Sequence, residues 1–240
     1  MHADEVDIDV ELVSELLIDQ FPDLAGLDIT AVRSTGTVNA IYRIGDGFSA
    51  RLPRSARWVP DLQKELHCLP MLARHLSLAI PEPVGRGRPS VRYPFPWAVY
   101  RWIEGQPFDD GLVADQRQAA GDLARFVIEL RGVDPDQAPT GGRRPLLELD
   151  SVTRWAIEAA GDAIDGDATT TAWEAALRAP EWDGSSAWIH ADLLRPNLLV
   201  ERGRLCAVID FGAAGVGDPA TDVIAAWSAL GQAGREVFRS

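Results

Sequence analysis

The first hundred residues alternate short apolar runs with polar turns, a pattern typical of a small sheet flanked by helices. Apolar residues recur at three- and four-residue steps over residues 10–21, which predicts an amphipathic helix. A second helix is expected over residues 61–76, with Pro70 kinking or breaking it. The short apolar runs predict four strands, at residues 29–33, 40–44, 48–52 and 97–102.

From residue 104 onward the spacing of apolar residues is mainly helical. Gly, Asp and Thr residues predict a loop over residues 161–171, and two apolar runs around a turn containing Gly203 predict a β-hairpin over residues 198–209. A final helical pattern, residues 223–238, runs on without a C-cap, which indicates a second domain cut short at its C-terminus. The other helices are predicted at residues 115–131, 152–164 and 172–177.

These two patterns predict an α+β protein with two lobes. Residues 1–103 form the N-lobe, a small antiparallel sheet with one helix, and residues 104–240 form a mainly helical C-lobe. The segment Glu104-Gly105-Gln106-Pro107 marks the boundary between them.

Composition narrows the class of protein. The chain has 240 residues, of which 46% are hydrophobic, and no apolar run approaches the roughly 18 residues that span a bilayer. Its acidic start lacks the features of a signal peptide, so we expect a cytoplasmic protein that does not bind a membrane. Cys68 and Cys206 lack CxxC spacing, which predicts reduced, packed thiols.

The distribution of charge says more than its total. A net charge of −13 argues against a nucleic-acid partner. Residues 29–103 nevertheless hold eleven basic and four acidic residues, whereas residues 104–189 hold seven basic and seventeen acidic ones. A site for an anionic cofactor and a cationic substrate needs such neighbouring regions, although solvated faces produce the same blocks. The acids that could contact a cationic substrate, or simply face water, are at positions 109, 110, 115, 162, 165 and 167.

The polar residues that flank the predicted hairpin carry the chemistry. Asn197 precedes its first strand and Asp210 follows its second, so the two would lie side by side at the open end. An amide oxygen and a carboxylate are suitable ligands for Mg²⁺, which keeps water and phosphate oxygens in its remaining positions. Asp192, five residues before Asn197, is close enough to receive a proton from a bound hydroxyl.

Here the sequence resembles the aminoglycoside phosphotransferase family, small-molecule kinases with a protein-kinase-like fold. The resemblance rests on H-x-D-x-x-x-x-N at residues 190–197, I-D-F-G at residues 209–212 and G-D-P-x-x-D at residues 217–222. It implies that Asp192 is the catalytic base and that Asn197 and Asp210 bind Mg²⁺. It also implies that His190 and Asp218 brace the loop; a histidine here is a scaffold residue rather than a proton carrier.

The same resemblance extends to the N-lobe. It places Arg51 where the family usually has a lysine on the nucleotide phosphates, with Glu65 as its ion-pair partner; a guanidinium can bridge both. It also implies a phosphate-covering loop over residues 34–39, in which Gly36 and Thr37 present backbone N–H groups to the nucleotide. In the interlobe hinge, the main chains of Arg101 and Ile103 would bind the purine of ATP or GTP.

The expected reaction is therefore Mg²⁺-dependent transfer of the γ-phosphate of ATP or GTP to a hydroxyl of a small molecule, most plainly a cationic aminoglycoside-type antibiotic. Two alternatives stay open. The acceptor could be another metabolite or antibiotic, such as a macrolide, a choline-like alcohol or a sugar. The chain could also be a nucleotide-binding module without catalysis. The sequence leaves the oligomeric state undecided.

Overall fold

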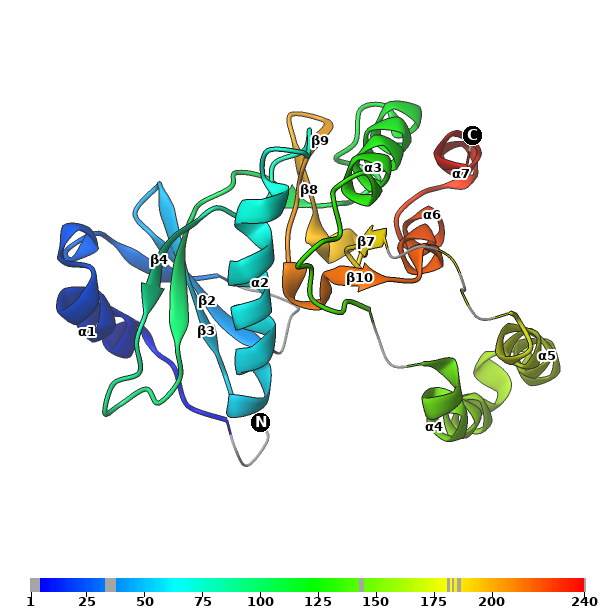
Figure 1. Cartoon of the computed structure of the whole chain (residues 1–240), viewed down its shortest axis with the longest axis horizontal. Coiled ribbons are helices and arrows are strands. Elements are labelled where there is room, and N and C mark those ends of the chain that lie inside the picture. The colour runs from blue at the N-terminus through cyan, green and yellow to red at the C-terminus, as the bar shows by residue number, and fades with distance from the viewer. Residues whose placement is uncertain are drawn as a thin grey trace.

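The computed structural model describes residues 5–32, 38–142, 145–180, 182, 184 and 187–239. Its N-terminal part is built on a five-stranded antiparallel sheet in the order β1-β2-β3-β5-β4 (Figure 1). The strands are β1 (Ile29–Ala31), β2 (Asn39–Ile44), β3 (Phe48–Pro53), β4 (Pro83–Gly87) and β5 (Trp97–Arg101).

Of the five strands in this sheet, β4 is the one that the sequence analysis missed. Its residues, Pro-Val-Gly-Arg-Gly, have little β-propensity. The glycines are needed because aromatic rings lie against them: a Cβ on Gly85 would come within 2.2 Å of Phe21, and one on Gly87 within 2.1 Å of Trp97. Packing against these two rings, which contact each other edge to face, therefore selects glycine here.

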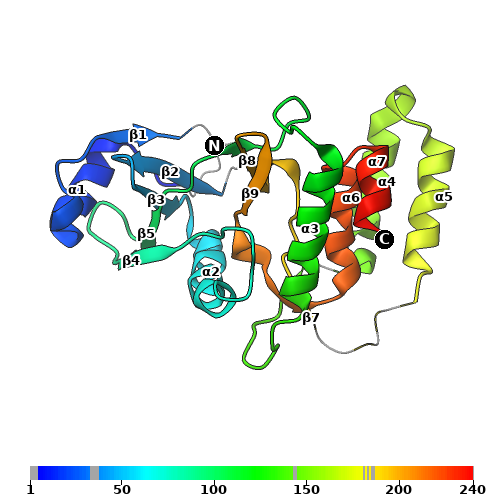
Figure 2. The same ribbon diagram turned by 90° about the horizontal axis from the view of Figure 1, so that it is seen from above.

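Two helices flank the sheet. The sequence analysis predicted both helices but described the N-lobe as a sheet with only one. Helix α1 (Val10–Gln20) packs on one face, and α2 (Val59–Leu72) lies between the other face and the C-terminal part (Figures 1 and 2). Pro70 was predicted to kink or break this helix; it does not break it, because α2 continues through Pro70 to Leu72. Proline leaves the carbonyl four residues earlier without its helical partner, and Arg86 donates a hydrogen bond to this carbonyl, Leu66 O, at 3.0 Å.

The C-terminal part combines helices with two small antiparallel sheets. Helix α3 (Gln116–Arg131) matches its prediction, whereas α5 (Gly166–Leu177) begins inside the predicted loop because Asp165 caps it, accepting from Ala168 N. The predicted final helix divides at Gly231. The remaining elements are α4 (Leu146–Ala160), α6 (Ala225–Ser228), α7 (Gln232–Phe238), β6 (Gln106–Pro107), β7 (Ala187–Ile189), β8 (Leu198–Glu201), β9 (Arg204–Val208) and β10 (Gly215–Gly217).

Two hydrophobic clusters hold these parts together. One lies between α1 and the sheet, and the second joins the inner face of α2 and the end of β5 to α3, the β8–β9 hairpin and α6. The second cluster crosses the boundary at residue 103, so α2 and the hairpin are fixed to one another by buried apolar contacts. Within the described ranges, no helix is long and apolar enough to cross a membrane.

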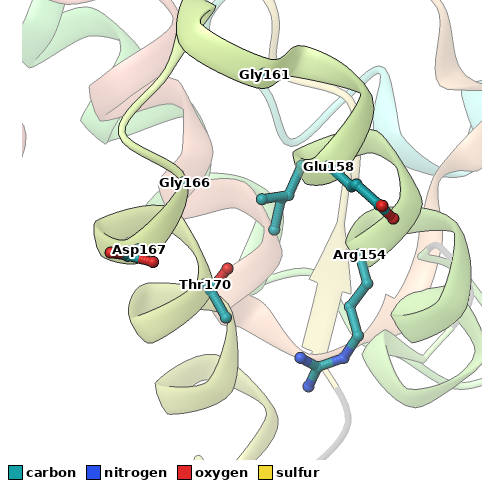
Figure 3. A pocket seen from close by; sticks show the side chains of 7 residues that line it. Arg154, Glu158, Gly161, Gly166, Asp167 and Thr170 are labelled. Atoms are coloured by element: carbon teal, nitrogen blue, oxygen red, sulfur yellow. The ribbon is translucent and has the colours of Figure 1, made fainter.

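Helices α4 and α5 pack against each other and lie beside this core (Figures 1 and 2). Neither helix has a fully buried residue, and Trp155 on α4 is 67% exposed. A pocket between them, shown in Figure 3, is lined by polar side chains that include Arg154, Glu158 and Asp167. It contains none of the residues that the motifs single out.

Candidate active site

The β8–β9 hairpin brings Asn197 and Asp210 to the same end of one ribbon. A β-bulge shifts the register by one residue, so that Asn197 accepts a hydrogen bond at 2.9 Å from Ile209 N and Asp210 follows one residue later. Asp210 has φ 67°, a left-handed conformation that turns the chain sharply at this point. Asn197 thus lies opposite Ile209, one residue before Asp210, and not directly opposite Asp210 as predicted.

Asn197 also fixes Asp192. Its amide Nδ2 donates to Oδ2 and to the main-chain carbonyl of Asp192, both at 2.9 Å. Because the amide nitrogen is used in this way, its oxygen is turned away from Asp192 and stays an acceptor. Ala191, with φ 66°, supplies the sharp turn that sets the Asp192 carboxylate next to the hairpin.

His190 ties the loop of Asp192 to the strand that leads to Asp210. Its ring accepts from Asp192 N at Nδ1 (3.2 Å) and donates from Nε2 to Ile209 O (3.1 Å), an arrangement that requires the neutral Nε2–H tautomer. The ring is fully buried and contacts Phe211 edge to face. Burial lowers the pKa of His190 more than the nearby carboxylates of Asp222, Asp210 and Asp192 raise it, so the neutral form is favoured.

Asp222 is a buried residue that the sequence analysis did not single out. Its two carboxylate oxygens accept from His190 N at 2.9 Å and from Ala191 N at 2.8 Å, which holds the backbone of the turn before Asp192. Asp218, which the family resemblance made a brace, caps the following short helix by accepting from Ala220 N. The signal for Asp222 was present as the last residue of G-D-P-x-x-D.

The burial of His190 predicts a pH dependence of stability. Its folded pKa lies below the unfolded value near 6.5, so the unfolded chain binds more protons in this window and the free energy of unfolding falls as pH decreases below about 6.5. The slope should approach, at most, about 1.4 kcal/mol per pH unit.

Urea unfolding between pH 7.5 and 5.5 measures this slope. We expect His190→Gln to have a shallower slope than the wild type, whatever its stability at pH 7.5. The matched control is His75→Gln, which replaces a histidine with an exposed side chain. Equal slopes in all three proteins would contradict a neutral, buried His190.

Arg51 joins the two lobes through an ion-pair network that is buried at Glu65 and partly exposed at Asp210. Its Nη1 donates to Glu65 Oε2 at 2.7 Å and its Nη2 to Asp210 Oδ1 at 2.6 Å. Glu65 has no exposed surface, and it also accepts from the Tyr100 hydroxyl (2.7 Å) and from Phe211 N (2.9 Å). Glu65 on α2 and Arg51 on β3 thus hold both Asp210 and the residue after it.

The charges of this network support one another. Burial by itself lowers the pKa of Arg51, but the carboxylates of Glu65 and Asp210 raise it well above its ordinary value. Burial raises the pKa of Asp210, but the Arg51 guanidinium beside it contributes to a net lowering of this pKa, so Asp210 is ionised at neutral pH. The Asp210 side chain is 44% exposed while that of Arg51 is 13% exposed, so the carboxylate faces open space from a fixed position.

Of the residues predicted to contact the nucleotide, the structure describes those in the hinge but not those in the phosphate-covering loop. The main-chain N–H of Arg101 donates to Glu82 O and that of Trp102 to Gly47 O, both at 2.9 Å, which fastens the hinge to the sheet. The N–H of Arg101 is therefore used within the fold, and its carbonyl and the main chain of Ile103 are the groups left to consider for a purine. Gly36 and Thr37 lie outside the described residues.

Several of the acids considered for a cationic substrate have local partners. Asp115 caps α3 and Asp165 caps α5. Asp110 pairs with Arg195 at 2.9 Å, and Arg195 also donates to the carbonyl of Ser228 at 3.1 Å, which ties the loop between Asp192 and Asn197 to α6. Because these three acids have partners within the fold, the number of acids alone does not define a substrate pocket.

The chain is similar to known phosphotransferases in sequence and in fold. The profile of the phosphotransferase enzyme family matches residues 29–240. The uncharacterized protein YcbJ of Bacillus subtilis (strain 168) is 26% identical over 191 residues, which are 72% of this chain and 60% of that protein. The aligned chain thus spans less than two thirds of the length of this curated relative.

Solved structures share the fold. A GDP complex of a mutant aminoglycoside 2′-phosphotransferase-IIIa superimposes with a TM-score of 0.81 at 22% identity, covering 96% of this chain and 80% of that one. The macrolide 2′-phosphotransferase MphH from Brachybacterium faecium gives a TM-score of 0.64 at 24% identity over 96% of this chain and 81% of that one. The expected kinase-like α+β fold is confirmed. Because the family profile covers most of the chain, this protein belongs to the phosphotransferase enzyme family.

Proposed function

We propose that this protein transfers the γ-phosphate of ATP or GTP to a hydroxyl group of a small molecule. The observation that carries the proposal is the convergence of two pairs, Arg51 with Asp210 and Asp192 with Asn197, on either side of the buried His190 ring. Phosphoryl transfer requires positioning and charge neutralisation more than covalent catalysis, and these two pairs supply both.

The donor oxygens at the end of the hairpin fit Mg²⁺. Arg51 contacts Oδ1 of Asp210, and the amide oxygen of Asn197 faces away from Asp192. Mg²⁺ is commonly held by one or two protein oxygens together with phosphates and water. Among the described residues, no group of three or more His, Cys, Asp or Glu side chains could hold a metal ion. When bound, the ion would neutralise charge on the β- and γ-phosphates.

The N-lobe would bind the nucleotide. Arg51 would contact the α- and β-phosphates while Glu65 accepts from its Nη1. The Arg101 carbonyl and the Ile103 main chain would bind the purine, and Gly36 and Thr37 would cover the phosphates through backbone N–H groups. Solved structures of related folds contain GDP, ATP or ADP, which supports a nucleotide donor. We assign residues 1–103 to this task.

The C-lobe, residues 104–240, would bind the acceptor. Asp192 would accept the proton of the attacking hydroxyl while Asn197 holds its Oδ2, so that the oxygen of the acceptor attacks the γ-phosphorus and the nucleoside diphosphate leaves. His190 stays neutral and acts as a scaffold. Because the donor nucleotides are cytoplasmic metabolites, the proposed reaction belongs in the cytoplasm.

For the acceptor we propose a cationic, aminoglycoside-type molecule first. Solved structures of the same fold include complexes of other proteins with kanamycin and with gentamicin. A macrolide is the second candidate, because macrolide phosphotransferases have the same fold.

A transfer assay with γ-labelled ATP and GTP tests the proposal. The acceptors would be aminoglycosides, macrolides, choline-like alcohols and sugars, each with and without Mg²⁺. We expect label on one acceptor class, only with Mg²⁺, and none with Asp192→Asn. Nucleotide binding without transfer to any acceptor would instead favour a non-catalytic module.

A further inference from the structure

Asn39 ends the predicted phosphate-covering loop, but neither motif nor family resemblance gave its side chain a role. It opens β2 and pairs with Pro53 of β3, while Arg51 pairs with Ile41, so Asn39 and Arg51 are diagonal neighbours across the two strands. Residues two apart on a strand project from the same face, and long side chains reach one another along this diagonal. Asn39 therefore shares the face from which Arg51 reaches Glu65 and Asp210.

The chemistry of the contact fixes the orientation of the Asn39 amide. With its oxygen toward Arg51, this oxygen accepts from Nε at 3.0 Å and from Nη2 at 2.9 Å. The opposite orientation would set an NH₂ group against two N–H donors, which cannot form a hydrogen bond. One amide oxygen thus receives both donors along one edge of the guanidinium.

Three partners then surround the guanidinium. Asn39 receives Nε and one N–H of Nη2, Asp210 receives the other N–H of Nη2, and Glu65 receives one N–H of Nη1. These contacts engage four of the five N–H donors of an arginine. The remaining N–H is on Nη1, and its direction is set once the other four are held.

We propose that Asn39 is a positioning residue that orients the Arg51 guanidinium, and that it does so only because residue 51 is an arginine. A lysine ammonium has no planar edge with two parallel donors, so it could bind Glu65 without engaging Asn39 in the same way. The part of this proposal that concerns phosphate rests on the proposed function; the orientation of Arg51 does not.

The first test is independent of nucleotide. The Arg51 Nε–H resonance in a ¹H–¹⁵N spectrum of the full chain is identified by its loss in Arg51→Lys. We expect this proton to exchange with solvent about tenfold faster or more in Asn39→Ala, because the substitution removes a hydrogen bond from a charged donor. The matched control is Gln20→Ala, which removes an amide bonded to Arg88 N and O at a distant turn and should leave the resonance unchanged. Unchanged exchange in Asn39→Ala would overturn the proposal.

The second test is a double-mutant cycle on nucleotide affinity. Asn39→Ala should raise the dissociation constant of the Mg²⁺-nucleotide about tenfold in the Arg51 protein but less than twofold in Arg51→Lys, because Asn39 acts through the guanidinium. If Asn39→Ala weakened nucleotide binding equally in the wild-type and Arg51→Lys proteins, Asn39 would not act through the guanidinium. If Asn39→Ala does not fold, Asn39→Thr replaces it, because threonine is favoured in strands and its hydroxyl oxygen lies one bond closer to the backbone than the amide oxygen. The same changes in the dissociation constant are expected for this variant. If the wild type binds no nucleotide, the proposed function fails while the exchange measurement still decides the orientation of Arg51.

Discussion

Replacing Asp192 with asparagine is expected to lower kcat by about 10³-fold while the dissociation constant of the nucleotide changes less than threefold. An amide cannot accept the hydroxyl proton, and a positioned general base commonly contributes 10²–10⁴-fold. Asparagine keeps the size of the side chain and an oxygen that can still accept from Asn197 Nδ2, so the loop geometry should survive. Steady-state kinetics with the acceptor found in the transfer assay, together with calorimetric nucleotide titration, measure both quantities.

The control for this substitution is Asp46→Asn. Asp46 lies at the exposed turn between β2 and β3 and pairs only loosely, at 3.4 Å, with Arg43. We expect wild-type kinetics from it. Wild-type turnover in Asp192→Asn would show that another group removes the proton and would refute the assignment of Asp192.

Replacing Asp210 with alanine should abolish measurable turnover and remove the effect of Mg²⁺ on nucleotide affinity. Metal stabilisation of transition-state charge is worth several kcal/mol, which corresponds to about 10³-fold or more in rate. The substitution also deprives Arg51 Nη2 of its 2.6 Å partner, leaving Glu65 and Asn39 to hold the guanidinium. Nucleotide titrations with and without Mg²⁺ separate the loss of metal binding from any displacement of Arg51.

Asp210→Asn supplies the second variant for this site. Its amide oxygen can still accept from Arg51, so the fold should be retained while the charge that attracts Mg²⁺ is lost. A Mg²⁺-dependent affinity that persists in both variants would exclude Asp210 as a ligand. The two aspartates should therefore differ in kind, because the Asp192 variant is expected to lose kcat alone and the Asp210 variants to lose the response to Mg²⁺ as well.

Short-range patterns predicted much of the fold because they report local periodicity. The spacing of apolar and polar residues located β2, β3, β5, the hairpin and α3. The motif residues that flank the hairpin indicated which side chains carry oxygen ligands. The errors have local causes too. Glycine and proline concealed β4, and the Asp165 cap extended α5 into a stretch rich in Gly and Thr.

The contacts that make a site of these residues depend on the tertiary structure. Arg51 and Asp210 are 159 positions apart, and Glu65 and Phe211 are 146 apart, so no spacing rule could pair them. The same holds for Arg86, which satisfies the carbonyl left open by Pro70, and for Asp222, which holds the backbone before Asp192. By itself the sequence determined which chemical groups are present and on which strands and loops they lie. Only the packing of α2 against the hairpin decided which of them meet, because hydrogen bonds between distant segments form where buried apolar surfaces bring those segments together.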